Sequence, residues 1–249
     1  MDIYTGFAKV YSDVMRDIPY AKWEKYIVRT LKEFKIKDGL ILDLGCGTGE
    51  MTRRLKKRGY DMIGADFSAE MLQVAGEKDS EGILYLLQDM REFELYGTVR
   101  GIVSVCDSMN YMTDEEDFVQ VLKLANNYLD PGGIFIFDLK TAHFFRDVMG
   151  ENCFGENLED CSYFWENSYD AETKINGYAL TVFHREGDLY RKSEEMHWQR
   201  AYGIPEIKRM VKKSGMELVR IQDADDYGPA GRKSERIYVI ARESGKVLD

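Results

Sequence analysis

Residues 42–50 read "LDLGCGTGE", where three glycines alternate with other residues behind an aspartate that lies in an apolar run. A dinucleotide-binding fold has G-x-G-x-x-G at this place, because the third glycine packs helix on strand while the helix N-terminus faces a pyrophosphate. Here the third position is Glu50, whose carboxylate would repel a diphosphate. The Lys-Ser/Thr pair of a P-loop is also missing. The loop therefore favours a nucleoside ligand without phosphates.

The rest of the chain supports an α/β fold around this loop. From residue 40 onward, short apolar runs alternate with helical patterns, which is typical of βα units and a parallel sheet. The last two runs have no helix between them, so they should pair as an antiparallel hairpin. Seven strands are expected, at 40–44, 61–66, 83–88, 101–106, 134–139, 216–221 and 236–241.

Three helical segments are predicted from periodicity and end signals. Thr113 and Glu116 form a capping box ahead of an apolar stripe that ends before "DPGG". Pro205 is expected to open a second helix and Gly215 to stop it. Residues 1–37 have apolar residues at helical spacing and are predicted to form an N-terminal helical arm that caps the ligand edge of the sheet.

Residues 160–202 follow a different pattern, alternating with period two in three runs separated by turn-like "DAET" and "EGDL". This predicts an inserted antiparallel sheet, which places Arg200 and Tyr202 on one face and His197 with Gln199 on the other. Which face looks at the ligand stays open at this point. The whole chain, 1–249, is interpreted as one catalytic domain in which 141–203 is an inserted substrate lid.

Two carboxylates follow predicted strands at positions where acidic residues bind a nucleoside. Asp66 ends the second strand, about 20 residues beyond the glycine loop, where an acid binds ribose hydroxyls in nucleotide folds. The alternative for Asp66 is a helix cap before "SAEM". Asp89 follows the third strand, where its oxygen can accept from an exocyclic amine while Met90 lies against a purine face. Together the two acids indicate an adenosine.

With these residues in place, strand-"DLGCGTG", strand-"ADFS", strand-"QDM", "CDSMNYM" and "LDPGG" resemble, in order, the motifs of class I S-adenosylmethionine-dependent methyltransferases. The resemblance covers residues 38–140 and 204–243. It implies a Rossmann-like seven-stranded sheet with a terminal antiparallel hairpin and S-adenosylmethionine as cofactor, with Cys106 and Asp107 on the floor beneath its sulfur. The cofactor-binding residues it implies are Tyr11, Trp23, Gly45, Cys46, Gly47, Asp66, Phe67, Met71, Asp89, Met90, Cys106 and Asp107.

The N-terminal "GFAKVYSDVM" and "DIPYAKW" resemble the helical arm of the small-molecule branch, which includes bacterial sugar-amine N-methyltransferases and glycine N-methyltransferase-like enzymes. In such proteins the arm closes over the cofactor. A sulfonium is a cation, so the rings of Tyr11, Tyr20 or Trp23 are candidates for cation–π contacts, each worth roughly 0.5–2 kcal/mol. Simple packing of these rings in the core is the alternative.

Charge and composition limit the classes of partner that the protein is expected to bind. The net charge is −10, which repels a polyanion, so nucleic acid is a disfavoured partner. The basic stretch 53–58 is expected to be the solvated face of a helix rather than an RNA-binding stripe. No apolar h-region or membrane-length run is present, and this favours a cytoplasmic protein. The four cysteines include no closely spaced pair, so no metal site is expected.

The expected reaction is N- or O-methyl transfer to a small polar molecule, which requires alignment of the reactants and removal of a proton from the acceptor. "CDSMNYM" lacks the Pro-Pro-aromatic motif of amino-methylating DNA enzymes, and Asp107 rather than proline follows Cys106, unlike in RNA cytosine-C5 enzymes. RNA methylation and non-catalytic cofactor sensing remain as alternatives. Tyr111 and His184 are the predicted catalytic residues, and the predicted acceptor contacts are Arg200, Tyr202 and His197.

Each of these acceptor-side residues has a structural alternative. The histidines can be satisfied within the fold, and Arg200 can form an ion pair inside the sheet. The inserted sheet is predicted to roof the pocket at the carboxyl ends of the parallel strands. Its aromatic faces are also compatible with packing against a second subunit, so a homodimer stays open.

Overall fold

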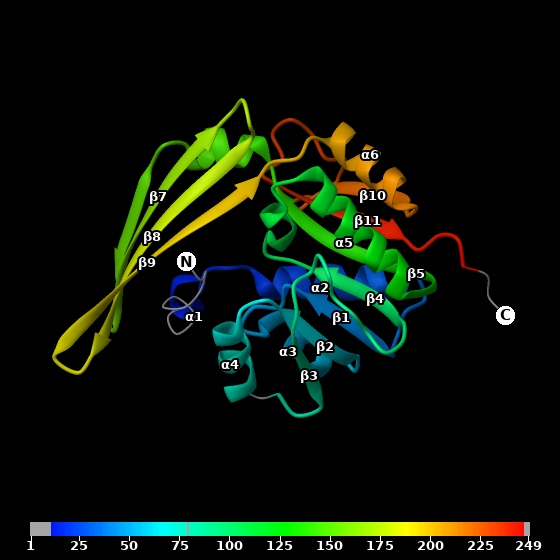
Figure 1. The fold of residues 1–249 in the computed structure, drawn as a ribbon, viewed down its shortest axis with the longest axis horizontal. Helices are drawn as coiled ribbons and strands as arrows, with labels where there is room; N and C mark the ends of the chain where they lie inside the picture. Colours follow the sequence, from blue (N-terminus) through cyan, green and yellow to red (C-terminus); the bar gives the residue numbers. More distant parts are fainter. Residues whose placement is uncertain (1–10, 79, 247–249) are drawn as a thin grey trace.

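The computed structural model describes residues 11–78 and 80–246 and contains two sheets (Figure 1). The larger sheet has seven strands: β1 (Leu40–Leu44), β2 (Asp61–Asp66), β3 (Ile83–Leu87), β4 (Val99–Ser104), β5 (Leu129–Lys140), β10 (Glu217–Asp223) and β11 (Arg236–Arg242). Their order is β10-β11-β5-β4-β1-β2-β3. β1 to β5 pair in parallel, and β11 is antiparallel to both β5 and β10. The predicted fold class and the terminal hairpin are confirmed.

Two strands begin earlier than the sequence pattern predicted. β5 includes the "DPGG" segment, and β4 begins at Val99, which pairs with Leu129. Apolar periodicity did not mark these residues. Their strand conformation comes from hydrogen bonds to the neighbouring strand, which is a tertiary effect.

Helices cover both faces of this sheet. α2 (Tyr20–Glu33) and α3 (Glu50–Lys57) bury side chains with one face, and α5 (Glu115–Tyr128) and α6 (Ile204–Ser214) with the other. The predicted stop of α6 at Gly215 holds, because Gly215 has a φ of +87°. Two shorter helices are α1 (Tyr11–Val14) and α4 (Ala69–Glu77).

The predicted capping box of α5 is wrong. The helix begins at Glu115 behind Asp114, and neither Thr113 nor Asp114 caps it with a side-chain hydrogen bond. The Thr113 carbonyl instead accepts a hydrogen bond of 3.0 Å from Arg200. A contact between distant segments has therefore replaced the local motif.

The smaller sheet is the insertion, and it has four strands where the sequence predicted three. They are β6 (Cys153–Asn157), β7 (Cys161–Asp170), β8 (Ile175–Glu186) and β9 (Leu189–Arg200), all antiparallel in this order. β6 was missed because it is largely exposed and has no apolar alternation. Figure 1 shows this sheet leaning away from the core, with β9 leading back toward α6. We call it the inserted sheet below.

Two short helices and the N-terminal arm complete the fold. η1 (Ser108–Tyr111) follows β4, and η2 (Phe144–Met149) leads into the inserted sheet. In α2, Trp23, Ile27 and Leu31 are buried on one face, as the spacing predicted. The part of the predicted arm before Tyr11 lies outside the described residues. Within 11–78 and 80–246, no helix is both long and apolar enough to cross a membrane.

Candidate active site

A pocket with a volume of about 280 Å³ lies where the carboxyl ends of the parallel strands face the inserted sheet. The carboxyl edge of such a sheet is the usual ligand site of doubly wound folds. One side of the pocket consists of the glycine loop and the segments after β2, β3 and β4, and we call it the cofactor wall because most of the predicted cofactor-binding residues lie there. The other side consists of inward side chains of the inserted sheet, namely Trp165, Tyr178, Leu180, His197 and Gln199, and we call it the acceptor wall because the inserted sheet is predicted to roof the acceptor.

The glycine loop is bound tightly onto β2. The backbone amides of Gly45 and Cys46 donate to the Ala65 carbonyl at 2.8 and 3.0 Å. Gly45 has a φ of +75°, and a Cβ there would lie 2.8 Å from the Cβ of Ser108. Gly47 has a φ of +53°, but a Cβ there would meet nothing within 4 Å. The space next to the Gly47 backbone is therefore open to a ligand.

Asp66 is buried at the end of β2 and turned toward the glycine loop. Its Oδ2 accepts from the Gly47 amide at 2.7 Å, and its Oδ1 accepts from the Ser68 amide at 2.9 Å. The cap of α4 is Ser68, whose Oγ accepts from the Met71 amide at 3.2 Å. Burial raises the pKa of Asp66, while the backbone donors oppose the shift. Because a carboxylate has about four acceptor sites, Asp66 retains capacity for a ligand hydroxyl.

Asp89 and Met90 line the same wall. Arg91 holds Asp89 through an ion pair of 2.6 Å between Nη2 and Oδ2. This hydrogen-bonded arginine lowers the pKa of Asp89, although partial burial opposes it, and so keeps the carboxylate charged. The methyl carbon of Met90 approaches Gly45, which places an apolar surface beside the loop.

Asp43 is a pocket residue to which the sequence analysis gave no role. It is buried, and its Oδ2 accepts from Thr52 Oγ1 at 2.6 Å. Burial, with the negative charge of Asp66 adding to it, raises the pKa of Asp43 to about 7. The signal was present in the sequence as the acid just ahead of the glycines.

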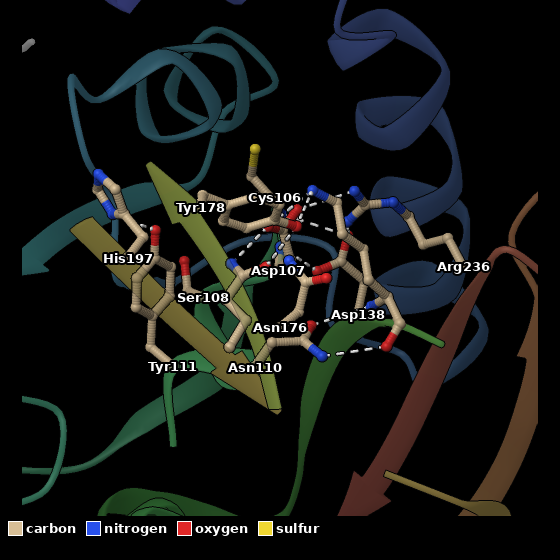
Figure 2. Close-up of polar contacts among 12 residues, drawn as sticks. Cys106, Asp107, Ser108, Asn110, Tyr111, Asp138, Asn176, Tyr178, His197 and Arg236 are labelled. Atoms are coloured by element: carbon tan, nitrogen blue, oxygen red, sulfur yellow. Dashed lines mark hydrogen bonds and ion pairs between the residues drawn. The ribbon is translucent and has the colours of Figure 1, made fainter. Parts of the chain in front are cut away.

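The floor of the pocket has an unusual backbone (Figure 2). Cys106 and Asp107 have φ values of +66° and +58°, a region that non-glycine residues seldom adopt. Their amides donate to the buried Asp138 carboxylate at 3.3 and 2.8 Å. Such strain costs of order 1–3 kcal/mol per residue and persists only when surrounding contacts impose it. Asp138 supplies these contacts.

Paired charges hold this floor in place. Arg236 forms ion pairs with Asp138 and, at 2.8 Å, with Asp107, which also lies 3.3 Å from Lys140 Nζ. Burial opposes ionisation of Asp107, but the charges of Lys140 and Arg236 prevail and lower its pKa. The Trp23 ring lies 4.8 Å from the Arg236 guanidinium.

That position corrects one prediction about the arm. Trp23 is buried beneath Arg236 and is absent from the lining of the pocket, because its helix face turns to the core. Tyr11 and Tyr20 do line the pocket, and Tyr11 Oη lies 3.7 Å from Cys106 Sγ. The other residues predicted to bind cofactor all line the pocket, namely Gly45, Cys46, Gly47, Asp66, Phe67, Met71, Asp89, Met90, Cys106 and Asp107.

The inserted sheet presents His197 and Gln199 to the pocket. Gln199 Nε2 donates to Asp107 Oδ2 at 2.8 Å, and Tyr178 Oη donates to Gln199 Oε1 at 3.0 Å. These bonds join the acceptor wall to the floor. Lys140 Nζ, 3.4 Å from Tyr178 Oη, adds a cation at the junction.

The predicted acceptor contacts Arg200 and Tyr202 do not line the pocket, because their side chains bind the segment before α5. Arg200 donates to the Thr113 carbonyl and lies 3.7 Å from Glu115, and Tyr202 donates to the Met112 carbonyl. Period-two alternation correctly separated this pair from His197 and Gln199. The packing of β9 against the segment before α5 decided which face is inside.

The two predicted catalytic residues have different positions. Tyr111 lines the pocket, and its hydroxyl lies 2.9 Å from His197 Nδ1. His184 is not part of the pocket lining. Leu180 on the same strand does line the pocket, and it stands four residues before His184, or about 13 Å along the strand at 3.3 Å per residue.

Comparison with known proteins agrees with this arrangement. Residues 41–133 match a family model described as a methyltransferase domain. The putative methyltransferase YqeM of Bacillus subtilis is 35% identical over 250 residues, covering 99% of each chain. A solved S-adenosylmethionine-dependent methyltransferase from Clostridium acetobutylicum has a TM-score of 0.86 and 29% identity, covering 97% of this chain and 99% of its own. DesVI of Streptomyces venezuelae shares the fold at a TM-score of 0.77 and 16% identity, covering 98% and 100%. From its sequence and its fold, this chain belongs to the S-adenosylmethionine-dependent methyltransferases.

Proposed function

We propose that the protein methylates a nitrogen or oxygen atom of a small polar molecule held between the cofactor wall and the acceptor wall. The observation that carries this proposal is that one pocket contains both walls, with Gly47 and Asp66 on one side and His197 and Gln199 on the other. When bound, S-adenosylmethionine supplies a methyl group on a sulfonium sulfur.

The cofactor wall fits this nucleoside. The open backbone at Gly47 suits the methionine part, and the buried Asp66 carboxylate at the end of β2 suits ribose hydroxyls. Asp89 and Met90 offer a charged acceptor and an apolar surface for adenine. Of the two interpretations of Asp66, ligand contact is favoured, since Ser68 already caps α4.

The acceptor wall, together with Tyr111 and Lys140 beside it, supplies positioning. Tyr111, Tyr178, His197, Gln199 and Lys140 present donors and acceptors to a molecule in the pocket. Holding both reactants in near-attack geometry contributes about 7–11 kcal/mol to a transfer reaction, so a fixed polar wall is the main catalytic requirement. These ionisable groups argue against a protein that only senses the cofactor.

RNA methylation has less support. The arginines of the basic stretch 53–58 are already engaged: Arg53 is buried and donates to the Thr48 carbonyl at 2.8 Å, and Arg54 and Arg58 both pair with Glu24. They do not form a free basic stripe. Together with a net charge of −10, this disfavours a polyanionic substrate.

The test is a thermal-shift comparison of S-adenosylmethionine, S-adenosylhomocysteine and NAD, followed by transfer of a radiolabelled methyl group to a panel of small amines, alcohols and carboxylates and to total tRNA. At a hundredfold excess over its Kd, a ligand stabilises the protein by about 2.7 kcal/mol. We expect stabilisation by the two sulfur nucleosides and label in a small acceptor. Label found solely in tRNA would contradict the proposal.

A further inference from the structure

One buried side chain holds the two ends of the inserted segment together. The insertion begins after Lys140, the last residue of β5, and its last strand, β9, ends at Arg200. Asn110 Nδ2 donates to the carbonyl oxygens of both residues, at 3.0 and 2.8 Å. Asn110 Oδ1 accepts from the Lys140 amide at 2.9 Å. A single amide group therefore binds the backbone on both sides of the insertion.

The Lys140 backbone needs such a partner because β4 has already ended beside it. Thr141, the next residue, donates to the Glu235 carbonyl in the segment that leads into β11. Successive residues of an antiparallel pair alternate in direction, so the Lys140 peptide groups point away from β11, toward the side of β4. β4 stops at Ser104. The Asn110 side chain thus takes the place of a further peptide group of β4.

Asp107, three residues before Asn110, binds side chains at the same two ends. Its Oδ2 accepts from Gln199 Nε2 at 2.8 Å and lies 3.3 Å from Lys140 Nζ. Gln199 directly precedes Arg200 on β9. The Asn110 amide donates to the Asp107 carbonyl at 3.0 Å, which fixes the two residues relative to each other. Figure 2 shows both of them at the floor of the pocket.

The position of Asn110 separates it from ligand contact. Its side chain has 0% exposure, and it is not among the residues that line the pocket. The three bonds require two N–H donors and one acceptor on the same short side chain, which a carboxamide provides and a carboxylate does not. Any effect of Asn110 on a reaction in the pocket must therefore pass through the residues that it holds.

We infer that Asn110 is a positioning residue for methyl transfer, which fixes the acceptor wall against the floor of the cofactor wall. The inference rests on the proposed function, because its readout is transfer to an acceptor. By binding the backbone at Lys140 and Arg200, Asn110 sets where Lys140 Nζ and Gln199 meet Asp107. A displacement of about 1 Å at such a place can slow a reaction roughly a hundredfold, because the reactants leave near-attack geometry.

The first test measures steady-state transfer to the best acceptor from the panel. We expect acceptor kcat/KM to fall about a hundredfold in Asn110→Ala. Affinity for S-adenosylhomocysteine should change less than threefold, because Asp138 still binds the amides of Cys106 and Asp107. Unchanged kcat/KM in a folded Asn110→Ala protein, as judged by a single urea transition, would overturn the inference.

Asn110→Ser provides a graded variant. A hydroxyl has one proton, so it can donate to just one of the two carbonyls that Asn110 binds. Its acceptor kcat/KM should lie between those of wild type and Asn110→Ala. Asn110→Ser also carries the comparison if Asn110→Ala does not fold, and wild-type kcat/KM in this variant would then contradict the inference.

Asn126 offers a matched control. Its Nδ2 donates to the Ser244 carbonyl at 3.1 Å, and its Oδ1 accepts from the Ser244 amide at 3.0 Å, so it binds a backbone in the same paired way. Asn126 lies in α5 and does not line the pocket. Asn126→Ala should therefore keep wild-type kcat/KM. A loss equal to that of Asn110→Ala would show that any such amide bond matters, and would overturn the inference.

The second test is a double-mutant cycle with Gln199→Ala, which distinguishes positioning from a general loss of stability. If Asn110 acts by placing Gln199, removing Gln199 matters much less once Asn110 is gone. We expect the double variant to lose far less kcat/KM than the product of the two single losses. A loss equal to that product would mean that the two side chains act independently, and the inference would be wrong.

The outcomes separate the two proposals. If wild type labels no small acceptor, the proposed function is wrong and the positioning role is wrong with it. If wild type labels a small acceptor while Asn110→Ala and Asn110→Ser keep its rate, only the positioning role is wrong. Reduced turnover with an equally reduced affinity for S-adenosylhomocysteine would make Asn110 a support of the cofactor wall and would also overturn the inference.

Discussion

The cofactor wall and the acceptor wall differ in how their side chains are placed. On the cofactor wall, Asp66, Asp89 and Asp107 each stand at or just beyond the end of a parallel strand. On the acceptor wall, His197 and Gln199 lie inside a long strand of the inserted sheet, and their neighbours point the other way.

This difference explains which functional residues can be predicted from a sequence. A residue at the carboxyl end of a parallel strand lies at the carboxyl edge of the sheet, whatever the details of packing. A residue within a two-faced strand has an equal chance of facing inward or outward until the sheet is docked. Asp107 of the cofactor wall binds Gln199 of the acceptor wall and also Arg236. Substituting Arg236 therefore tests the connection between the two walls most directly.

The largest expected effect is on stability, from Arg236→Met. Removing the guanidinium leaves Asp107 and Asp138 buried, with Lys140 as the remaining cation near Asp107. Breaking a buried ion pair from one side typically costs about 3–5 kcal/mol, and we expect that loss in urea unfolding. Arg242→Met, which removes an exposed pair with Glu217, is the control and should cost about 1 kcal/mol or less. Equal losses in both variants would show that the floor does not depend on this arginine.

A second test concerns the cofactor wall alone and uses pH. The pKa of Asp43 is raised to about 7 in the folded protein, against about 3.9 in an unfolded chain. Between these values the unfolded chain releases a proton that the folded protein keeps, so the free energy of unfolding decreases as pH rises, by roughly 1.4 kcal/mol per unit. The stabilising contribution is complete below about pH 4 and lost above about pH 7.

Asp43→Asn should remove this dependence, because the amide stays neutral and its oxygen can still accept from Thr52. Urea unfolding of both proteins at pH 5, 6 and 7 checks the prediction, and the variant should gain relative stability with each step. Parallel curves for the two proteins would mean that Asp43 titrates normally.

The third effect sharpens the description of the cofactor wall. Asp66→Ala removes the carboxylate at the end of β2, and hydrogen bonds to charged groups are worth about 1.5–3 kcal/mol. Calorimetry should therefore show S-adenosylhomocysteine binding weakened roughly 10- to 150-fold in a folded protein. Asp61→Ala, at the exposed start of the same strand, is the control. Unchanged affinity in Asp66→Ala would reduce Asp66 to a structural residue of the loop.

The smallest effect is expected on the outer face of β9. Arg200→Ala removes a bond to the Thr113 carbonyl and should cost about 1 kcal/mol in unfolding, with acceptor KM changed less than twofold. Its neighbour Gln199 points inward, so Gln199→Ala should raise acceptor KM while leaving S-adenosylhomocysteine affinity nearly intact. The reverse pattern in steady-state kinetics would mean that the acceptor wall is the other face.

The sequence by itself determined the sheet of βα units, its terminal hairpin and the position of the cofactor wall. Strand periodicity, the glycine loop and the acids after β2 and β3 are local signals, and the fold brings all strand ends to one edge. It also predicted Tyr111 beside the pocket and the alternation of β9.

Only the tertiary structure decided the rest. Which face of β9 is inside depends on Asn110, which donates to the Arg200 carbonyl, and on Arg200 binding the Thr113 carbonyl. The burial of Trp23 beneath Arg236 and the pairing of Asp107 with Arg236 likewise join residues far apart in the chain. The physical reason is that a period-two pattern is symmetric between two faces, and only contacts between distant segments break that symmetry.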